Sequence, residues 1–270
     1  MSSLKKRIIT AVIIVPILLA MIFFLKGSAF YFATVALYAW FAWEWLRLIP
    51  VDKTWHMFLG LLLYLLAYSF AFFLPVGILL LIAVLWWLCA PILLVLYSKQ
   101  RSGWYAHKWL VAVMGLVVTL PFGVAANILV HFEHGQWLLV YAIALIACAD
   151  SGAYFIGRWK GNKKLAPSIS PNKTYAGLWG GLCCSALLSL IAGILFHLAP
   201  SYLLWFVCIS VISALYSVVG DLFISMIKRL RGVKDTGVLL PGHGGILDRC
   251  DAMCAGIPLL TLGLLFMSVG

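Results

Sequence analysis

The acidic side chains of this chain are few, and most of them lie at unusual places. Only eight of the 270 residues are Asp or Glu. Five of them fall at or near the ends of long apolar stretches: Asp150, Asp221, Asp235, Asp248 and Asp251. An ionised carboxylate inside a membrane-spanning helix is costly unless it is paired or binds a metal, so these residues are candidates for a functional site. The alternative is a structural ion pair, for example between Asp221 and a neighbouring Arg or Lys.

Helical spacing gathers polar groups on single faces. At about 100° per residue, four residues fall within roughly a 100° arc of one predicted helix: Asp221, Ser225, Lys228 and Arg229. This face runs from a carboxylate, past a hydroxyl, to two cations. Asp248 and Asp251 are three residues apart and also share a face. Their alternative role is to complement a helix dipole, which contributes about 0.3–1 kcal/mol each.

Two further segments have the composition of phosphate sites. Residues 241–245 include His243, Gly244 and Gly245, and glycines let a loop present backbone N–H groups to an anion. Residues 170–177 bring Lys173 and hydroxyls to the start of a predicted helix, where anions bind readily. Taken alone, an ordinary loop explains the first segment equally well, and a capped helix start explains the second.

Together these residues offer carboxylates for a hard divalent cation and cations and amides for phosphates. Mg²⁺ in proteins is commonly bound by one or two carboxylates plus substrate phosphates. The chemistry that this combination predicts is phosphoryl or nucleotidyl transfer to or from a lipid phosphate. The chain has no Walker A sequence, which disfavours P-loop ATP hydrolysis.

The composition indicates the elements that must position these groups. The mean hydropathy is +1.10, 65% of residues are apolar and only 10% are charged, whereas soluble domains have about 25% charged residues. This excludes a separate soluble catalytic domain. Long unbroken apolar runs also exclude a membrane β-barrel, whose segments are short and alternating. We therefore expect an all-α, polytopic bundle of transmembrane helices.

The apolar stretches predict nine spans, because each is long enough to cross a bilayer. They are residues 8–25, 30–49, 57–73, 76–97, 110–130, 137–156, 176–199, 202–227 and 252–269. The first has a core too long for a signal peptide and is read as a retained span.

The basic residues predict the orientation of these spans. If the N-terminus is inside, 18 of the 19 Lys and Arg residues fall on the inner side, and only Lys26 falls outside. By the positive-inside rule the N-terminus is cytoplasmic and the C-terminus is outside. The net charge of +11 thus reflects topology, and we expect no nucleic-acid partner. The seven cysteines show no zinc-site spacing.

The polar material is concentrated late in the chain. We expect one membrane domain, residues 1–270, in which the helices of residues 1–135 form a lipid-facing scaffold. Helices and inner loops of 136–270 would carry the catalytic site, which faces the cytoplasm.

One long segment resembles a known family. Residues 225–251, from Ser225 through Lys228, Pro241 and Asp248 to Asp251, closely resemble the signature of the phosphatidate cytidylyltransferases, or CDP-diacylglycerol synthases. Residues 170–174 (Ser-Pro-Asn-Lys-Thr) are similar to a second conserved element of that family, and the polytopic layout is similar over nearly the whole chain. The chain departs from the signature at Cys250, where an apolar residue or Thr is usual.

The resemblance implies a reaction between CTP and phosphatidate that gives CDP-diacylglycerol and pyrophosphate, with Mg²⁺ alone or together with a second metal ion. From the residues themselves we expect Asp221 and Asp248 as principal metal ligands, with Asp251 and Asp150 next. Ser225 and Lys228 join the catalytic group. Substrate contacts are expected from Ser170, Asn172, Lys173, Thr174, Arg229, Lys234, Asp235, His243, Gly244, Gly245 and Arg249.

The implied setting is the cytoplasmic (inner) membrane of a bacterium, with bilayer lipids around the protein. A homodimer is expected only as the commonest default for oligomers. Two other functions fit parts of the pattern. A CTP-dependent polyprenol kinase would share the helices and the basic inner site, and an ion-coupled transporter would use the carboxylates as ion sites.

Overall fold

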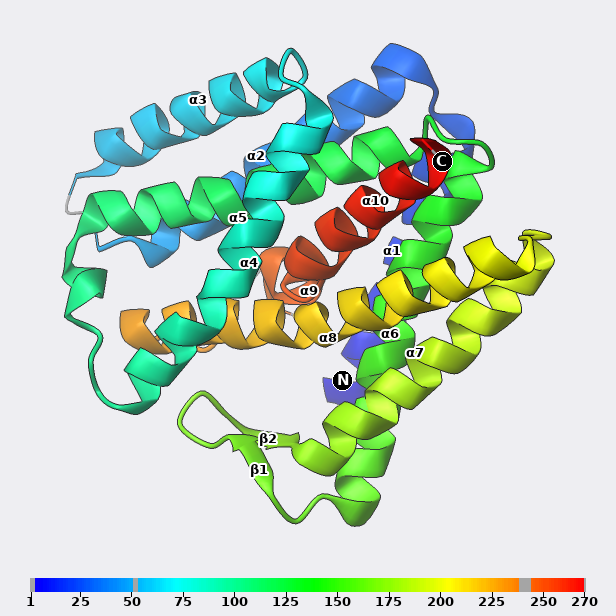
Figure 1. Cartoon of the computed structure of the whole chain (residues 1–270). Coiled ribbons are helices and arrows are strands. Elements are labelled where there is room, and N and C mark those ends of the chain that lie inside the picture. The colour runs from blue at the N-terminus through cyan, green and yellow to red at the C-terminus, as the bar shows by residue number, and fades with distance from the viewer. Residues whose placement is uncertain (1–2, 51–52, 238–243, 270) are drawn as a thin grey trace.

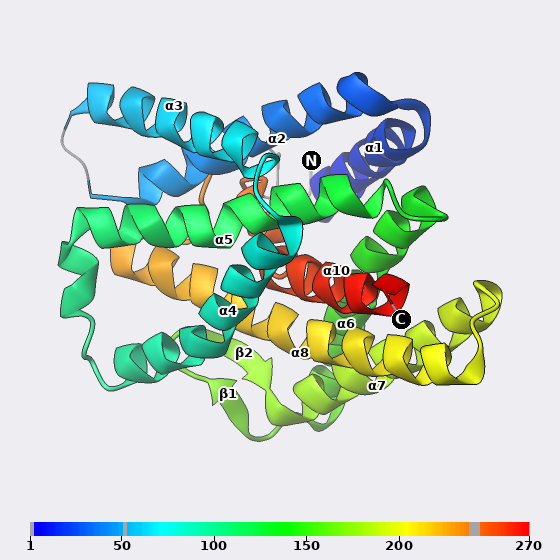
Figure 2. The same ribbon diagram turned by 45° about the horizontal axis from the view of Figure 1, so that its top comes forward.

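The computed structural model describes residues 3–50, 53–237 and 244–269. The chain is 81% helical, and Figures 1 and 2 show the helices as one bundle. The helices are α1 Ser3–Phe24, α2 Gly27–Leu48, α3 Thr54–Ala71, α4 Val76–Ser98, α5 Lys108–Leu129, α6 Gly135–Lys160, α7 Tyr175–Leu195, α8 Pro200–Arg231, α9 Leu247–Cys250 and α10 Met253–Val269, with a 3-10 turn, η1, at Gly103–Ala106.

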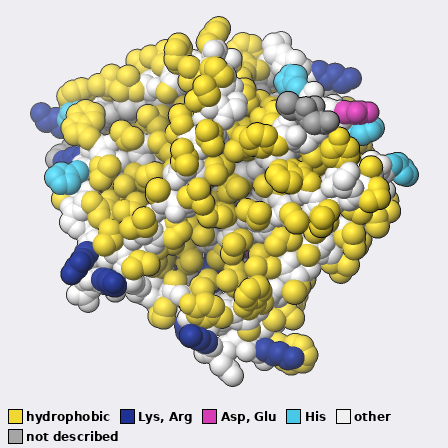
Figure 3. Space-filling model, viewed as in Figure 1, with side chains coloured by type: hydrophobic (Ala, Val, Ile, Leu, Met, Phe, Trp, Pro, Cys, Tyr) yellow, Lys and Arg dark blue, Asp and Glu magenta, His cyan; other side chains and the backbone are white. Residues whose placement is uncertain are grey.

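The nine apolar stretches of the sequence coincide with nine long helices in the described part of the chain. Six of them, α3 to α8, are long and apolar enough to cross a bilayer. The apolar described parts of α1 and α10 are shorter, and α2 contains Glu44 and Arg47. The chain is thus a multi-pass helical membrane protein, whereas the count of nine spans and its orientation stay predictions. Figure 3 shows hydrophobic side chains over most of one face, with Lys and Arg at its margins.

The all-α expectation is confirmed, and one short two-stranded element is added to the helices. After α6 the chain forms an antiparallel hairpin of β1, Lys164–Ala166, and β2, Ser170–Thr174. Ile169, in its turn, is only 2% exposed and anchors the hairpin in the main apolar core. The hairpin lies on the side of the bundle opposite α3 in both ribbon views.

Glycines let α6 and α7 pack backbone to backbone. A Cβ atom at Gly177 would lie 2.6 Å from the carbonyl oxygen of Ala153, and one at Gly181 would lie 2.7 Å from that of Ala149. Small residues permit such close approach between membrane helices. The hairpin that joins these two helices is therefore attached to a rigid pair.

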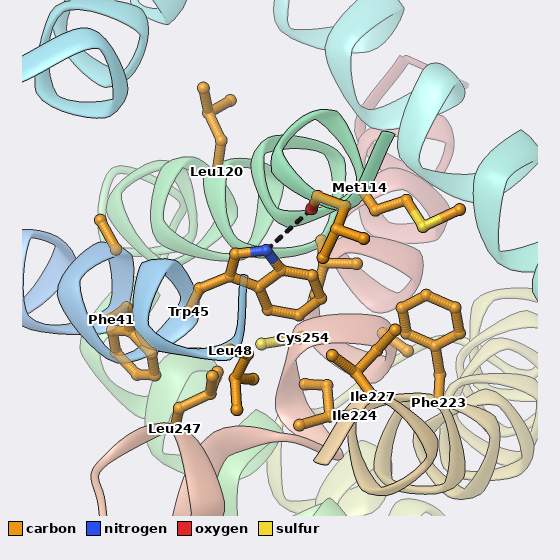
Figure 4. Packing of buried hydrophobic residues seen from close by; sticks show 14 of the residues in the cluster. Phe41, Trp45, Leu48, Met114, Leu120, Phe223, Ile224, Ile227, Leu247 and Cys254 are labelled. Carbon is orange, nitrogen blue, oxygen red and sulfur yellow. Dashed lines mark hydrogen bonds between the residues drawn. The ribbon is translucent and has the colours of Figure 1, made fainter. Parts of the chain in front are cut away.

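The main core lies between α2, α5, α8 and α10 and holds α8 in place. Trp45 of α2 is fully buried, and its indole Nε1 donates a hydrogen bond to the carbonyl oxygen of Val111 at 2.9 Å (Figure 4). Phe223, Ile224 and Ile227 of α8 point into the same core. Packing on this side leaves the opposite side of α8 for polar residues.

Candidate functional site

A polar cleft of about 330 Å³ lies where α6, α8 and α9 meet. Five of the lining residues are aspartates that the sequence singles out, and four are cations. The lining is Asp150, Asp221, Lys228, Arg229, Lys234, Asp235, Asp248, Arg249 and Asp251. The structure thus brings together most of the candidate residues of the C-terminal half.

A larger cavity, about 430 Å³, lies at the far ends of α6 and α7, where it is lined by His134, Trp137, Tyr141, Phe196, His197 and three aliphatic residues. Its lining is mostly apolar and carries no carboxylate. The charged groups that suit phosphate chemistry are in the smaller cleft.

The polar face of α8 forms one wall of the cleft. The hydroxyl of Ser225 donates a hydrogen bond to Oδ1 of Asp221 at 3.2 Å, one helical turn away. Met226 and Ile227, which lie between Ser225 and Lys228 in the sequence, are completely buried in the apolar core. Helical spacing alone therefore separates the polar face correctly from the packing face.

Lys173 of the hairpin reaches this wall. Its ammonium Nζ lies 2.5 Å from Oδ2 of Asp221, and about a quarter of each side chain is exposed. β2 thus delivers a cation to the cleft from between α6 and α7. The alternative role for Asp221 was a structural ion pair with a neighbouring Arg or Lys. The structure does pair Asp221 with a lysine, but this lysine is distant in sequence.

Lys228 lies between two carboxylates of the opposite wall. Its Nζ is 2.8 Å from Oδ1 of Asp248 and 3.9 Å from Oδ2 of Asp251. The Lys228 side chain is 8% exposed and that of Asp248 is 3% exposed. The ammonium neutralises a carboxylate that burial would otherwise destabilise.

The second oxygen of Asp248 organises the loop that precedes α9. Oδ2 accepts hydrogen bonds from the backbone N–H of Thr236 at 2.8 Å, from its hydroxyl at 3.1 Å and from the N–H of Gly245 at 2.9 Å. Only Oδ1, which Lys228 contacts, has capacity for a further ligand, since a carboxylate offers about four lone-pair sites.

The remaining sequence candidates have varied positions. Thr174 is buried, and its hydroxyl accepts the N–H of Gly177 at 3.1 Å, which caps α7; the capped helix start is therefore correct. Ser170 and Asn172 lie on β2 and do not line the cleft. The N–H of Gly245 is directed at Asp248, and His243 lies outside the described residues.

Sequence reasoning missed Glu44. It lies near the end of α2 and is 1% exposed. It accepts hydrogen bonds from the hydroxyl of Thr236 and the N–H of Leu247, which come before Asp248 in the sequence. The signal available was the same one that selects Asp221: a carboxylate within an apolar stretch. Thr236, which joins the two carboxylates, has no distinguishing sequence signal.

The cleft carboxylates suit a metal ion that also binds phosphates. In the described residues no three Asp, Glu, His or Cys side chains group closely enough to hold a metal by themselves. Mg²⁺, however, needs only one or two carboxylates when phosphates supply further oxygens. Burial, together with the nearby Asp221, raises the pKa of Asp251 well above its usual range, so a cation in the cleft would keep that carboxylate ionised. The donor set fits Mg²⁺.

Comparison with known proteins decides the family. The sequence profile described as "Cytidylyltransferase family" matches residues 5–267, nearly the whole chain. This chain belongs to the cytidylyltransferase family. Among its relatives, a phosphatidate cytidylyltransferase of Haemophilus influenzae is 34% identical over 283 residues, covering 96% of this chain and 97% of that protein.

Two further relatives carry the same name. The Pseudomonas aeruginosa protein is 36% identical over 260 residues, 96% of each chain. The Staphylococcus haemolyticus protein is 42% identical over 134 residues, 49% of this chain and 51% of that protein. The family resemblance inferred from residues 225–251 is confirmed.

The wall formed by α8 gives a first prediction. Replacing Ser225 by Ala removes the hydrogen bond to Asp221 and should lower turnover about tenfold, because a bond to a charged group contributes about 1.5–3 kcal/mol. Expression and membrane insertion should stay normal. Ile227→Leu, a volume-conserving change in the core, should leave turnover within about twofold of wild type. Turnover and detergent-extracted yield are measured for both; equal losses of activity would indicate a packing defect.

Proposed function

We propose that this protein is a phosphatidate cytidylyltransferase, which converts CTP and phosphatidate into CDP-diacylglycerol and pyrophosphate. The single observation that carries the proposal is the family match over residues 5–267, with relatives of that name at 34–36% identity over 96% of the chain. The cleft supports it, since it combines carboxylates with cations. A CTP-dependent lipid kinase or an ion-coupled transporter is less well supported, because neither name occurs among these relatives.

The reaction depends more on neutralising the negative charges of the phosphates than on proton transfer. The phosphate of phosphatidate is already anionic and can attack the α-phosphorus of CTP without a protein base. The obstacle is the approach of two anions and the charge that develops on the leaving pyrophosphate. Lys228, Arg229, Lys234 and Arg249 line the cleft and would neutralise these charges by fixed electrostatic contacts. Lys173 would do so from the hairpin.

The carboxylates would hold Mg²⁺. Asp221 and Asp251 border the cleft, Asp248 offers Oδ1, and Asp150 of α6 is the further candidate. A bound Mg²⁺ supplies Lewis-acid stabilisation of the phosphate oxygens. Ser170 and Asn172 of β2 stay proposed substrate contacts, and so do Asp235, His243 and Gly244.

We also propose the setting of the reaction. The distribution of Lys and Arg supports nine spans, a cytoplasmic N-terminus and a cleft that opens to the cytoplasmic side of the inner membrane. A lipid substrate would reach such a cleft from the bilayer. A homodimer is proposed only as the default state, and no nucleic-acid partner is expected.

Two differently labelled forms of CTP test the activity. Purified protein in phosphatidate-containing micelles with Mg²⁺ should transfer ³²P from the α position of CTP into chloroform-soluble lipid, and none from the γ position. A lipid kinase would transfer only the γ label. If neither label enters the lipid, the transporter becomes the leading alternative and the proposal fails.

The hairpin lysine gives a second prediction. Lys173→Met should raise the KM for CTP or phosphatidate and lower kcat/KM about 100-fold, because it removes a cation that pairs with Asp221 and that would neutralise the substrate phosphates. Lys160→Met is the matched control, since Lys160 at the end of α6 lies over the ring of Trp159, 4.4 Å from its centroid. That variant should keep kcat/KM within about twofold of wild type. Indistinguishable effects of the two substitutions would contradict the role of Lys173.

A further inference from the structure

Glu44 makes an unusual set of contacts for a residue of the N-terminal half. Its carboxylate is buried inside the bundle, and its four hydrogen bonds from described residues all come from uncharged donors. One donor is its own helix, through Trp40 Nε1 at 2.9 Å. The other three belong to the segment that carries Asp248.

These three contacts clamp both ends of that segment. Oε2 accepts the hydroxyl of Thr236 at 2.7 Å and the backbone N–H of Leu247 at 2.8 Å, while Oε1 accepts the N–H of Ile246 at 3.0 Å. Glu44 therefore accepts the N–H groups of the N-cap residue Ile246 and of Leu247, the first residue of α9. It ties Thr236, before the glycine segment, to the helix that follows it.

Thr236 links Glu44 directly to Asp248. Its single hydroxyl lies 2.7 Å from Glu44 Oε2 and 3.1 Å from Asp248 Oδ2, and its backbone N–H donates to Asp248 at 2.8 Å. The side chain is 3% exposed. When the hydroxyl is held by Glu44, the N–H of the same residue is aimed at Asp248.

The glycines around this link show how closely the loop encloses Glu44. A Cβ atom at Gly237 would lie 2.9 Å from Oε1 of Glu44. A Cβ atom at Gly245 would collide with both the Glu44 carboxylate and the Thr236 hydroxyl. The buried carboxylate thus lies in close contact with the described residues on both sides of segment 238–243.

We propose that Glu44 is a positioning residue for the reaction: through Thr236 and the N–H groups of Ile246 and Leu247, it fixes the residues that hold Asp248 in the cleft beside Lys228. This inference rests on the proposed function for its kinetic consequence, although the geometry of the clamp does not. Glu44 itself is not among the residues that line the cleft.

Isosteric variants of the full-length purified protein test the clamp. Glu44→Gln keeps the shape but offers one acceptor oxygen where two are used. Thr236→Val removes only the hydroxyl, and Thr236→Ser retains it. Trp40→Phe is the matched control, because it deletes the one hydrogen bond to Glu44 that does not come from the loop.

The expected result is a separation of kcat from KM. Glu44→Gln and Thr236→Val should each lower kcat per folded enzyme about tenfold or more, as small misplacements of reacting groups do, with KM for CTP changing less than about threefold. Thr236→Ser and Trp40→Phe should stay within about threefold of wild type. The double variant Glu44→Gln/Thr236→Val should have a kcat no lower than that of the less active single variant, because the effects of coupled residues are not additive.

Amide hydrogen exchange supplies a readout that does not depend on turnover. Glu44→Gln should accelerate exchange at Ile246 and Leu247 at least about tenfold, while α6 and α7 stay protected. If wild type forms no CDP-diacylglycerol, the proposed function fails, and exchange alone decides on the clamp. Unchanged exchange, or unchanged kcat per folded enzyme in both Glu44→Gln and Thr236→Val with only a lower Tm, would overturn the positioning role. If Glu44→Gln does not fold, Thr236→Val carries the same test.

Discussion

Asp248→Asn is expected to lower turnover about 100-fold or more, because it removes charge from a site that stabilises a developing anion. The variant should also be less stable. Its amide oxygen can accept the three loop hydrogen bonds, but its amide nitrogen then faces the Lys228 ammonium, which lies 2.8 Å from Oδ1 in the wild type. An uncompensated buried charge costs about 3–5 kcal/mol. Thermal unfolding and Mg²⁺-dependent turnover on one preparation measure both effects.

A second substitution separates stability from catalysis. Adding Lys228→Met to Asp248→Asn removes the stranded cation and should restore more than half of the lost Tm. It should not restore turnover, because both groups line the cleft. A variant Asp248→Asn that is destabilised, yet responsive to Mg²⁺ and substantially active, would make Asp248 a structural counter-ion only.

Gly245→Ala is expected to damage the site through overpacking. The added Cβ would collide with the carboxylate of Glu44 and the hydroxyl of Thr236, and the N–H that donates to Asp248 at 2.9 Å must shift with the backbone. Forcing a methyl group into a packed site costs about 1–3 kcal/mol. We expect turnover to fall about tenfold or more, with a lower unfolding temperature.

A glycine in open surroundings is the control for that substitution. Gly77 lies in the first turn of α4, and a Cβ there would meet no other atom within 4 Å. Gly77→Ala should leave activity unchanged and stability equal or up to about 1 kcal/mol higher, because Ala favours helix. If Gly245→Ala behaves like Gly77→Ala in turnover and in unfolding, the enclosed loop described above is wrong.

Local periodicity explains which parts of the fold could be predicted. The apolar runs locate the long helices because a helix in lipid must be apolar along its length. The face of Asp221 and Ser225 follows from 3.6 residues per turn, and the burial of Met226 and Ile227 follows from the same geometry. The capping of α7 by Thr174 is likewise a short-range effect.

The contacts that were not predicted are long-range ones. The ion pair between Lys173 and Asp221 depends on how the hairpin folds against α8, and β1 is too short to show strand alternation. The donors to Glu44 lie as far as 203 residues away. No spacing rule connects residues at that separation, so the position of Thr236 between two carboxylates could come only from the fold.

The distance between Glu44 and its partners has a consequence for how the protein is made. Thr236 follows Glu44 by 192 residues, and at about 5–20 residues per second its synthesis lags by roughly 10–40 s. During that interval α2 carries a carboxylate whose loop donors do not yet exist. Until then, water is a more favourable environment than lipid for this charged end of α2. The contacts around Glu44 can therefore form only after residue 247 has been synthesised.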